Sequence, residues 1–109
     1  MERVTGNIYR TTRLRRSEEF QETLLNTAQA RIERIVSYGH ASPVDFWYDQ
    51  PQNEWVLLLA GRAGLRFDNE DEECLLEAGD YILIPAHQRH RVAWTDPAGE
   101  TIWLAVHFK

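Results

Sequence analysis

Short apolar runs, separated by turn-forming residues, recur along the chain from residue 30 onward. The turn signals are the stretches Gly39–Pro43, Ala78–Asp80 and Asp96–Gly99, together with Gly61 and Gly64. Short strands at this regular spacing are typical of an all-β sandwich or barrel. The runs that we expect to be strands are Ala30–Tyr38, Trp55–Ala60, Leu65–Phe67, Leu75–Leu76, Tyr81–Ile84, His90–Trp94 and Thr101–Phe108.

Length and charge restrict the class of protein. A chain of 109 residues with 43% hydrophobic residues fits one folded domain. The net charge of −5 argues against nucleic acid as the main partner, because binding to phosphate needs a basic face. The longest apolar run is too short to span a membrane. The single cysteine, Cys74, excludes an internal disulfide, and no secretory signal is evident, so we expect a cytoplasmic protein.

Residues 1–29 are predicted to form an arm followed by a short helix. Ser17 suits the helix N-cap, and Phe20, Leu24 and Ala28 recur every four residues. We expect this helix to end near residue 26 or 27. The arm is basic, but acidic residues follow it directly, so we interpret it as solvated; its arginines are Arg3, Arg10, Arg13, Arg15 and Arg16.

Alternation along the predicted strands assigns side chains to two faces. Three sets should each share a face: Glu54 with Val56 and Leu58, His90 with Val92 and Trp94, and Trp103 with Ala105 and His107. The run Trp55–Ala60 is apolar on both faces, so its outer face needs a cover, either the helix or a second subunit. We therefore expect a homodimer. The acidic stretch Asp68–Glu73 lacks the spacing of a calcium loop and is predicted to be a solvated hairpin tip.

The segment Gly79–His90 resembles the second signature of the cupin family. Gly79, Pro85 and His90 match it in spacing: a glycine turns into a strand, a proline ends that strand, and an inward-facing histidine opens the next. Two positions depart from the pattern. His87 stands where the family usually has glycine, and Trp94 where it usually has asparagine.

The first cupin signature is present only in its later half. Glu54, the six residues after it and Gly61 match, but the preceding histidine pair is absent. Pro51 favours a register in which Tyr48 and Gln50 occupy the histidine positions; the other register places Trp47 and Asp49 there. The resemblance covers residues 31–108. It implies a cupin-type antiparallel β-barrel, or jelly roll, over residues 30–109.

The resemblance further implies a pocket in which Glu54 and His90 meet. Together with Gln50, or with Asp49 in the other register, they would hold Mn²⁺, Fe²⁺, Ni²⁺ or Zn²⁺. Tyr48, Trp94 and His107 are then candidates for substrate binding, with His107 also a candidate fourth ligand, and His87 is a candidate proton donor. The structural alternatives are that Glu54 pairs with an arginine at the rim and that His90 is a hydrogen-bonded core residue.

Three functions compete on this basis. The first is a small cupin that binds a divalent metal and a small molecule. The cupin family includes dioxygenases, isomerases and decarboxylases, so this protein could be an enzyme of one of these types, but the sequence does not decide whether it is. The second is a metal-free binding or sensing module, favoured by the missing histidine pair and the aromatic run Phe46–Tyr48. The third is a structural dimer whose barrel has no cavity.

Overall fold

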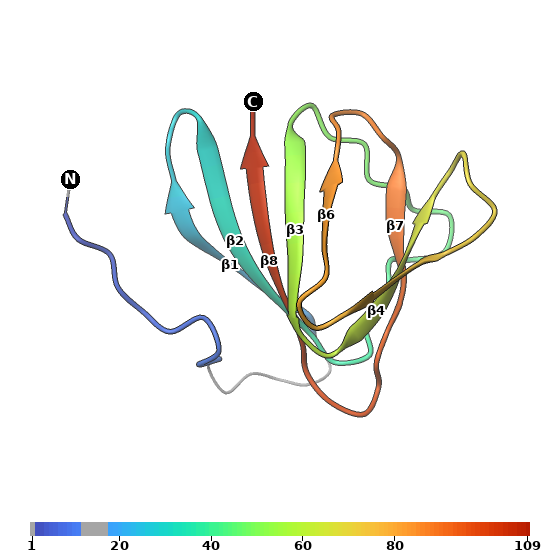
Figure 1. Cartoon of the computed structure of the whole chain (residues 1–109), viewed down its shortest axis with the longest axis horizontal. Helices are drawn as coiled ribbons and strands as arrows, with labels where there is room; N and C mark the ends of the chain where they lie inside the picture. The colour runs from blue at the N-terminus through green and yellow to red at the C-terminus, as the bar shows by residue number, and fades with distance from the viewer. Residues whose placement is uncertain (1, 12–17) are drawn as a thin grey trace.

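The chain is built of antiparallel strands in two sheets, as the computed structural model of residues 2–11 and 18–109 shows (Figure 1). The larger sheet has the order β1-β2-β8-β3-β6, with bounds Phe20–Asn26, Ala30–Ser37, Thr101–Phe108, Asn53–Ala60 and Tyr81–Ile84. The smaller sheet has the order β5-β4-β7, with bounds Cys74–Glu77, Arg62–Phe67 and His90–Thr95. The predicted all-β architecture is confirmed.

The hydrophobic core lies between the two sheets and follows the period of two that the sequence predicts. Along β3, Glu54, Val56 and Leu58 are buried while their neighbours are only partly so. Leu58 is completely inaccessible to solvent. The cluster around these side chains also contains Ala63, Leu65, Phe67, Leu76, Ile84 and Trp103.

The predicted N-terminal helix is wrong. Residues Phe20–Asn26 form β1, which pairs antiparallel with β2. Thr27 stabilises the connecting turn, since its backbone N–H donates to the Ala30 carbonyl and its hydroxyl oxygen accepts from the Ala30 N–H. Pairing with a neighbouring strand therefore overrides a weak four-residue apolar repeat. The proposed N-cap, Ser17, lies outside the described residues.

The predicted alternation along β7 fails at Trp94. Gly64 of β4 pairs with Trp94, but the next residue of β4, Leu65, pairs with Val92, so Ala93 is an extra residue in a β-bulge. A bulge reverses the alternation, which turns Trp94 to the outer face and Thr95 inward. There the indole lies over Gly64, and a Cβ at this position would overlap it. The sequence indicated a turn at Gly64, and this prediction is wrong, because Gly64 is an interior residue of β4.

The segment that resembles the second cupin signature folds as that signature implies. Gly79, with a φ of 94°, turns the chain between β5 and β6. Pro85 directly follows the last residue of β6, and His90 opens β7 with a buried side chain. The acidic stretch 68–73 joins β4 to β5 and is exposed, as predicted.

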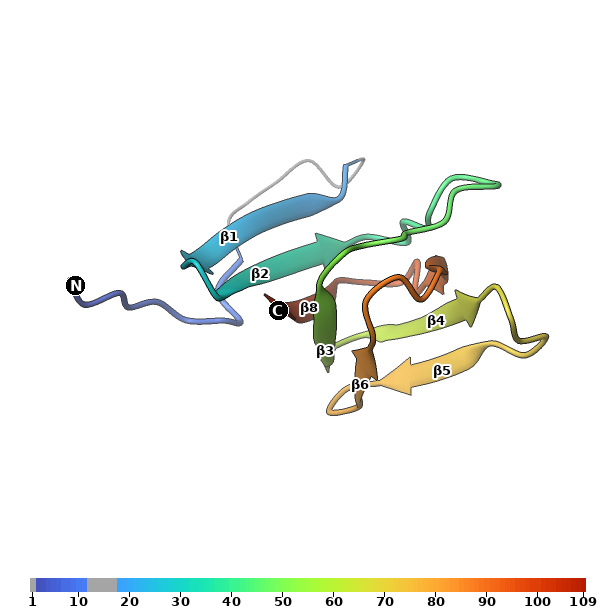
Figure 2. The ribbon, with the colours of Figure 1, turned by 90° about the horizontal axis from the view of Figure 1, so that it is seen from above.

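Figure 1 shows that the strands converge at one end of the molecule and fan apart at the other, and Figure 2 shows the two sheets from above. Antiparallel order brings the starts of β2, β3 and β7 and the ends of β6 and β8 to the same end. One inner row there runs across four strands, because Arg31 pairs with His107, His107 with Glu54, and Glu54 with Ile84.

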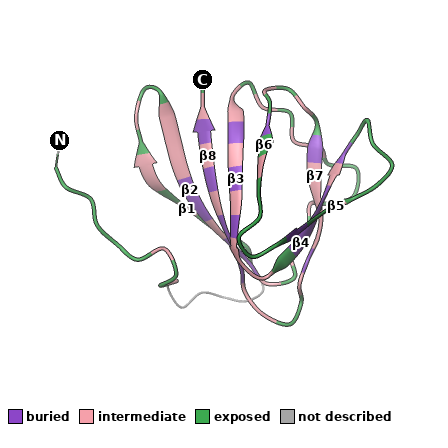
Figure 3. Ribbon diagram, in the orientation of Figure 1, coloured by how far each residue is buried: buried purple, intermediate pink, exposed green. Residues whose placement is uncertain are grey.

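The outer face of the larger sheet carries an apolar row. Leu83, Trp55, Val106 and Ile32 are successive cross-strand partners, and Leu83 is 53% exposed. Figure 3 shows exposed residues along the edge strand β6. In the described part of the chain no helix covers this row, since residues 20–26 of the segment predicted to do so form strand β1 of the same sheet. The homodimer stays a prediction. Within residues 2–11 and 18–109 there is also no helix that could cross a membrane.

Candidate functional site

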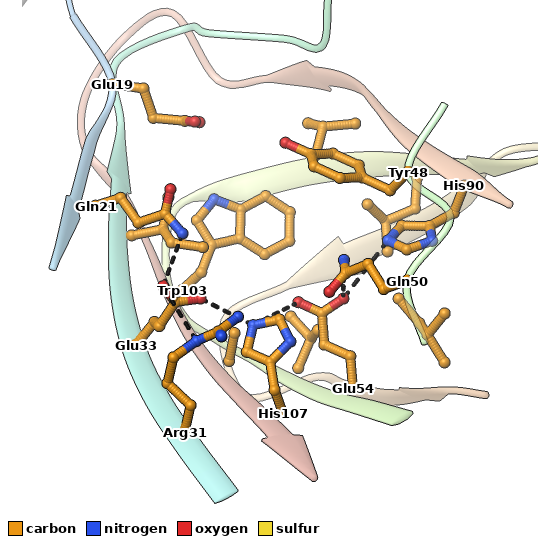
Figure 4. Close-up of a pocket in the computed structure, with 16 residues that line it drawn as sticks. Glu19, Gln21, Arg31, Glu33, Tyr48, Gln50, Glu54, His90, Trp103 and His107 are labelled. Atoms are coloured by element: carbon orange, nitrogen blue, oxygen red, sulfur yellow. Dashed lines mark hydrogen bonds and ion pairs between the residues drawn. The ribbon is translucent and has the colours of Figure 1, made fainter. Parts of the chain in front are cut away.

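A cavity of about 200 Å³ opens between the sheets at the end where the strands fan apart (Figure 4). Toward that end of the sheets the lining is polar, with Glu54 on β3 and His107 on β8 (the polar wall), and further along the same strands Val56 and Ala105 are apolar (the floor). The apolar lining residues are Ile35, Val56, Leu65, Ile84, Val92, Trp103 and Ala105. The polar and charged ones are Glu19, Gln21, Arg31, Glu33, Tyr48, Gln50, Glu54, His90 and His107.

The structure brings Glu54 and His90 together in this cavity. Nε2 of His90 lies 3.5 Å from Oε1 of Glu54, and both residues are buried. Nδ1 of His90 donates to the carbonyl of Gln88 at 2.9 Å. Since Nδ1 carries a proton, Nε2 carries one only when the ring is positively charged, and the Glu54 carboxylate favours that form.

His107 extends this pair into a longer chain of acids and imidazoles. Its Nε2 lies 2.8 Å from Oε1 of Glu33 and 3.7 Å from Oε2 of Glu54, and all three residues are buried. Gln21 donates to the other oxygen of Glu33 at 2.8 Å. Nδ1 of His107 is buried and has no hydrogen-bond partner within the described part of the chain. Glu33, His107, Glu54 and His90 thus form a continuous buried network along the cavity wall.

Tyr48 and Gln50 line the cavity, while Asp49 does not. Tyr48 forms an isolated β-bridge with His90 and stacks on its ring at 5.3 Å between centroids. The amide of Gln50 donates to Oε1 of Glu54 at 3.5 Å. This geometry corresponds to the register in which Tyr48 and Gln50 take the positions of the missing histidines.

Two of the residues predicted for the site lie outside the cavity. His87 is exposed and its Nδ1 contacts Oδ1 of Asp49 at 2.8 Å. Its φ of 64° explains the glycine that the cupin signature has at this position, because left-handed backbone suits glycine best. Trp94 is turned outward by the bulge, and its indole donates to Glu73 at 2.9 Å. Neither side chain reaches a ligand in the cavity.

Burial and charge shift the pKa of two cavity residues. Burial lowers the pKa of His90, but the hydrogen bond to Glu54, the Gln88 carbonyl and the Glu54 charge together outweigh it, so the net shift is upward. Burial raises the pKa of Tyr48, and the nearby carboxylates Glu19 and Glu54 raise it further. The carboxylates near these two rings thus favour the charged form of His90 and the neutral form of Tyr48.

Sequence reasoning missed the contributions of Glu19, Gln21 and Glu33. The first two belong to the segment that we expected to be helical, where alternation was not considered. Glu33 lies on β2, and the period of two within Arg31–Glu33–Ile35 does signal a shared inner face. Only the pairing of β2 with β8, which the sequence does not show, places Glu33 beside His107.

Comparison with known proteins now identifies the fold family. Residues 35–107 match the family described as Cupin domain. The chain belongs to the cupin family. Comparison with curated protein sequences finds no match to this cupin.

Solved structures resemble this cupin over most of its length. A candidate mannose-6-phosphate isomerase from Ralstonia eutropha JMP134 is 43% identical, with 96% of this chain and 97% of that chain covered and a TM-score of 0.91. A cupin superfamily protein from Desulfitobacterium hafniense DCB-2 is 18% identical, with 88% and 82% covered and a TM-score of 0.73. The Fe(II) form of HppE is 21% identical, with 83% and 50% covered and a TM-score of 0.69. At sequence identities of 18% and 21%, the last two likenesses show the fold alone.

The family implies a metal ion, so the donor set of the cavity is the relevant test. Within residues 2–11 and 18–109, no three His, Cys, Asp or Glu side chains are grouped so that they could hold one. Glu54 and His90 supply two donors, but Gln50 directs its N–H to Glu54, and the proton on Nε2 of His107 points to Glu33. The residues as arranged do not fit a resident metal. The metal role of Gln50, Glu54 and His90 stays a prediction.

Proposed function

We propose that this cupin is a binding module for a small organic molecule and that its site works without a resident metal. The observation that carries the proposal is the cavity itself, because it is open, about 200 Å³ in volume, and divided into an apolar floor and a polar wall. Pockets for small molecules are mostly apolar with a few converging polar groups that orient the ligand.

The polar wall is preorganised for hydrogen bonding. Glu54 is held from three sides, by Gln50, His90 and His107. Held side chains lose little conformational entropy when a ligand binds, which favours affinity. A completely filled barrel, as a purely structural protein would have, lacks such a wall and such a cavity.

The charge of the cavity argues against a sugar phosphate. The Ralstonia relative is named as a candidate isomerase of mannose 6-phosphate. In the described part of this cupin three carboxylates line the cavity, and the one arginine among the described lining residues, Arg31, lies 3.7 Å from a Glu33 oxygen. A phosphate dianion would be repelled by the carboxylates and would have no uncompensated cation to bind.

Thermal unfolding with a panel of small metabolites and, separately, with divalent metals tests the proposal. A ligand at 100 times its Kd raises the free energy of unfolding by about 2.7 kcal/mol. For a chain of this size the melting temperature should then rise by about 10 °C. We expect such a shift from a small organic molecule in the presence of EDTA.

A cavity-filling variant makes the test specific. Ala105→Phe, on the cavity floor, should abolish the ligand-induced shift, whereas Ala98→Phe, in an exposed turn, should keep it. If Ala105→Phe does not fold, loss of the shift in Glu54→Gln serves the same purpose. A shift from metals alone, lost in His90→Ala, would contradict the metal-free function and support a metal-dependent one.

A further inference from the structure

The charges that line the cavity bear on the kind of ligand it binds, an inference that rests on the proposed binding function. Among the described residues that line it, three are carboxylates, Glu19, Glu33 and Glu54, against the single guanidinium of Arg31. Arg31 lies beside Glu33, so that its charge compensates a carboxylate that is already there. Even with His90 protonated, the described lining carries an excess of negative charge.

Glu19, which lines the cavity, is held by a neutral partner. The Ser37 hydroxyl donates to Oε2 of Glu19 at 2.7 Å, and the indole N–H of Trp103 donates to the same Ser37 oxygen at 3.3 Å. Ser37 thereby connects the carboxylate to the aromatic ring. Figure 4 shows the Glu19 carboxylate and the Tyr48 hydroxyl facing each other, with the Trp103 ring below both in this view.

The cavity offers hydrogen-bond acceptors together with aromatic faces. The carboxylates of Glu19 and Glu54 both accept, and both residues line the cavity. Tyr48 and Trp103 add two aromatic rings, whose faces attract cations. The upward shift of the Tyr48 pKa, caused by burial and then by Glu19 and Glu54, is consistent with a negative potential at this position.

We infer that the ligand is a small organic amine, bound as its ammonium ion with a short hydrocarbon part on the cavity floor. An ammonium group has donors only, which matches a wall rich in acceptors and in negative charge. An alcohol matches the floor but brings no charge, and a carboxylate brings the wrong charge. The apolar floor gives the hydrocarbon part a place that a bare metal ion would leave empty.

Three probes of nearly equal size test this inference: benzylamine, benzyl alcohol and benzoate. Titration calorimetry at pH 7.5, low ionic strength and with EDTA should show benzylamine binding at least about tenfold more tightly than benzyl alcohol, and no binding of benzoate. Raising the salt concentration to about 0.5 M should weaken benzylamine binding, because partly exposed charges such as Glu19 are screened.

Matched variants locate the charge. Glu19→Gln keeps an oxygen that can accept from Ser37 and should weaken benzylamine binding about three- to tenfold without changing the affinity for benzyl alcohol. Glu72→Gln, an exposed position on the β4–β5 loop, should change neither affinity. Because Glu19 is exposed, the variant should unfold at the temperature of the unaltered protein.

The outcomes separate this inference from the function on which it rests. If benzyl alcohol or benzoate binds as tightly as benzylamine, the amine inference is wrong and the binding function stands. If none of the three binds and neither does any molecule of the metabolite panel, both are wrong. Stabilisation by Mn²⁺ or Zn²⁺ alone, lost in Glu54→Gln, would also overturn the inference.

Discussion

The buried pair Glu33–His107 gives the sharpest test of the network, because removing one member should cost far more than removing both. We consider Glu33→Leu and His107→Phe, which keep side chains of similar size. In either single variant the remaining partner is buried without its 2.8 Å hydrogen bond. A buried polar group left unsatisfied costs about 1–3 kcal/mol, and more if it is charged.

We expect each single variant to lose about 2–3 kcal/mol of unfolding free energy. The double variant should cost about 2 kcal/mol less than the sum, since replacing both partners by apolar groups removes the unsatisfied group as well. Urea unfolding followed by tryptophan fluorescence, with EDTA present, measures all three differences. For this chain, 1 kcal/mol corresponds to roughly 4 °C in melting temperature.

The comparison of the two single variants with the double variant is a double-mutant cycle, and the chain contains a matched control for it. Asp49 and His87 form the same kind of pair at the same distance of 2.8 Å, but their side chains are 49% and 68% exposed. Exposed ion pairs contribute about 0–1 kcal/mol, so the cycle at Asp49 and His87 should show little coupling. Additive costs at Glu33 and His107, to within about 0.5 kcal/mol, would refute the reasoning that these two groups depend on each other.

Three further predictions follow from the same structure. Because the folded-state pKa of His90 lies above its unfolded value, stability should be greatest below about pH 6.5 and fall as the pH rises through the folded pKa; urea unfolding from pH 5.5 to 8.5 should show this fall, and His90→Gln should lose it. Gly64→Ala should cost about 1–3 kcal/mol through overlap with the Trp94 indole, and an unchanged melting temperature would contradict the packing described. Leu58→Ala should cost about 3–5 kcal/mol in urea unfolding, because Leu58 is fully buried; a loss below about 1 kcal/mol would contradict its place in the core.

The fold was predictable from sequence where the pattern is local. Gly79, Pro85 and His90 lie within one short segment, and the turn, the strand and the next strand that they indicate are all present. Alternation along β3 likewise placed Glu54 on the inner face. Such features depend on neighbouring residues alone, so one sequence is enough to find them.

The remaining features depend on pairing between distant segments. The bulge at Ala93, which turns Trp94 outward, is defined only by the register of β7 against β4. Strand β1 exists because it pairs with β2, and its own apolar repeat suggested a helix. Glu33 becomes part of the site through β8, over seventy residues further along the chain. The periodicity within a strand does not show which other strand it pairs with.

The row Arg31–His107–Glu54–Ile84 makes the alignment of β8 decisive for the chemistry of the cavity. Sliding β8 by a single residue would expose the imidazole of His107 on the outer surface and present the isopropyl group of Val106 to the interior. The polar wall would then lose its central member while the sheet kept nearly all its backbone hydrogen bonds. A molecule with β8 out of register could thus stay folded and yet bind no ligand. A spectrum typical of β-structure therefore does not prove that a protein sample is able to bind.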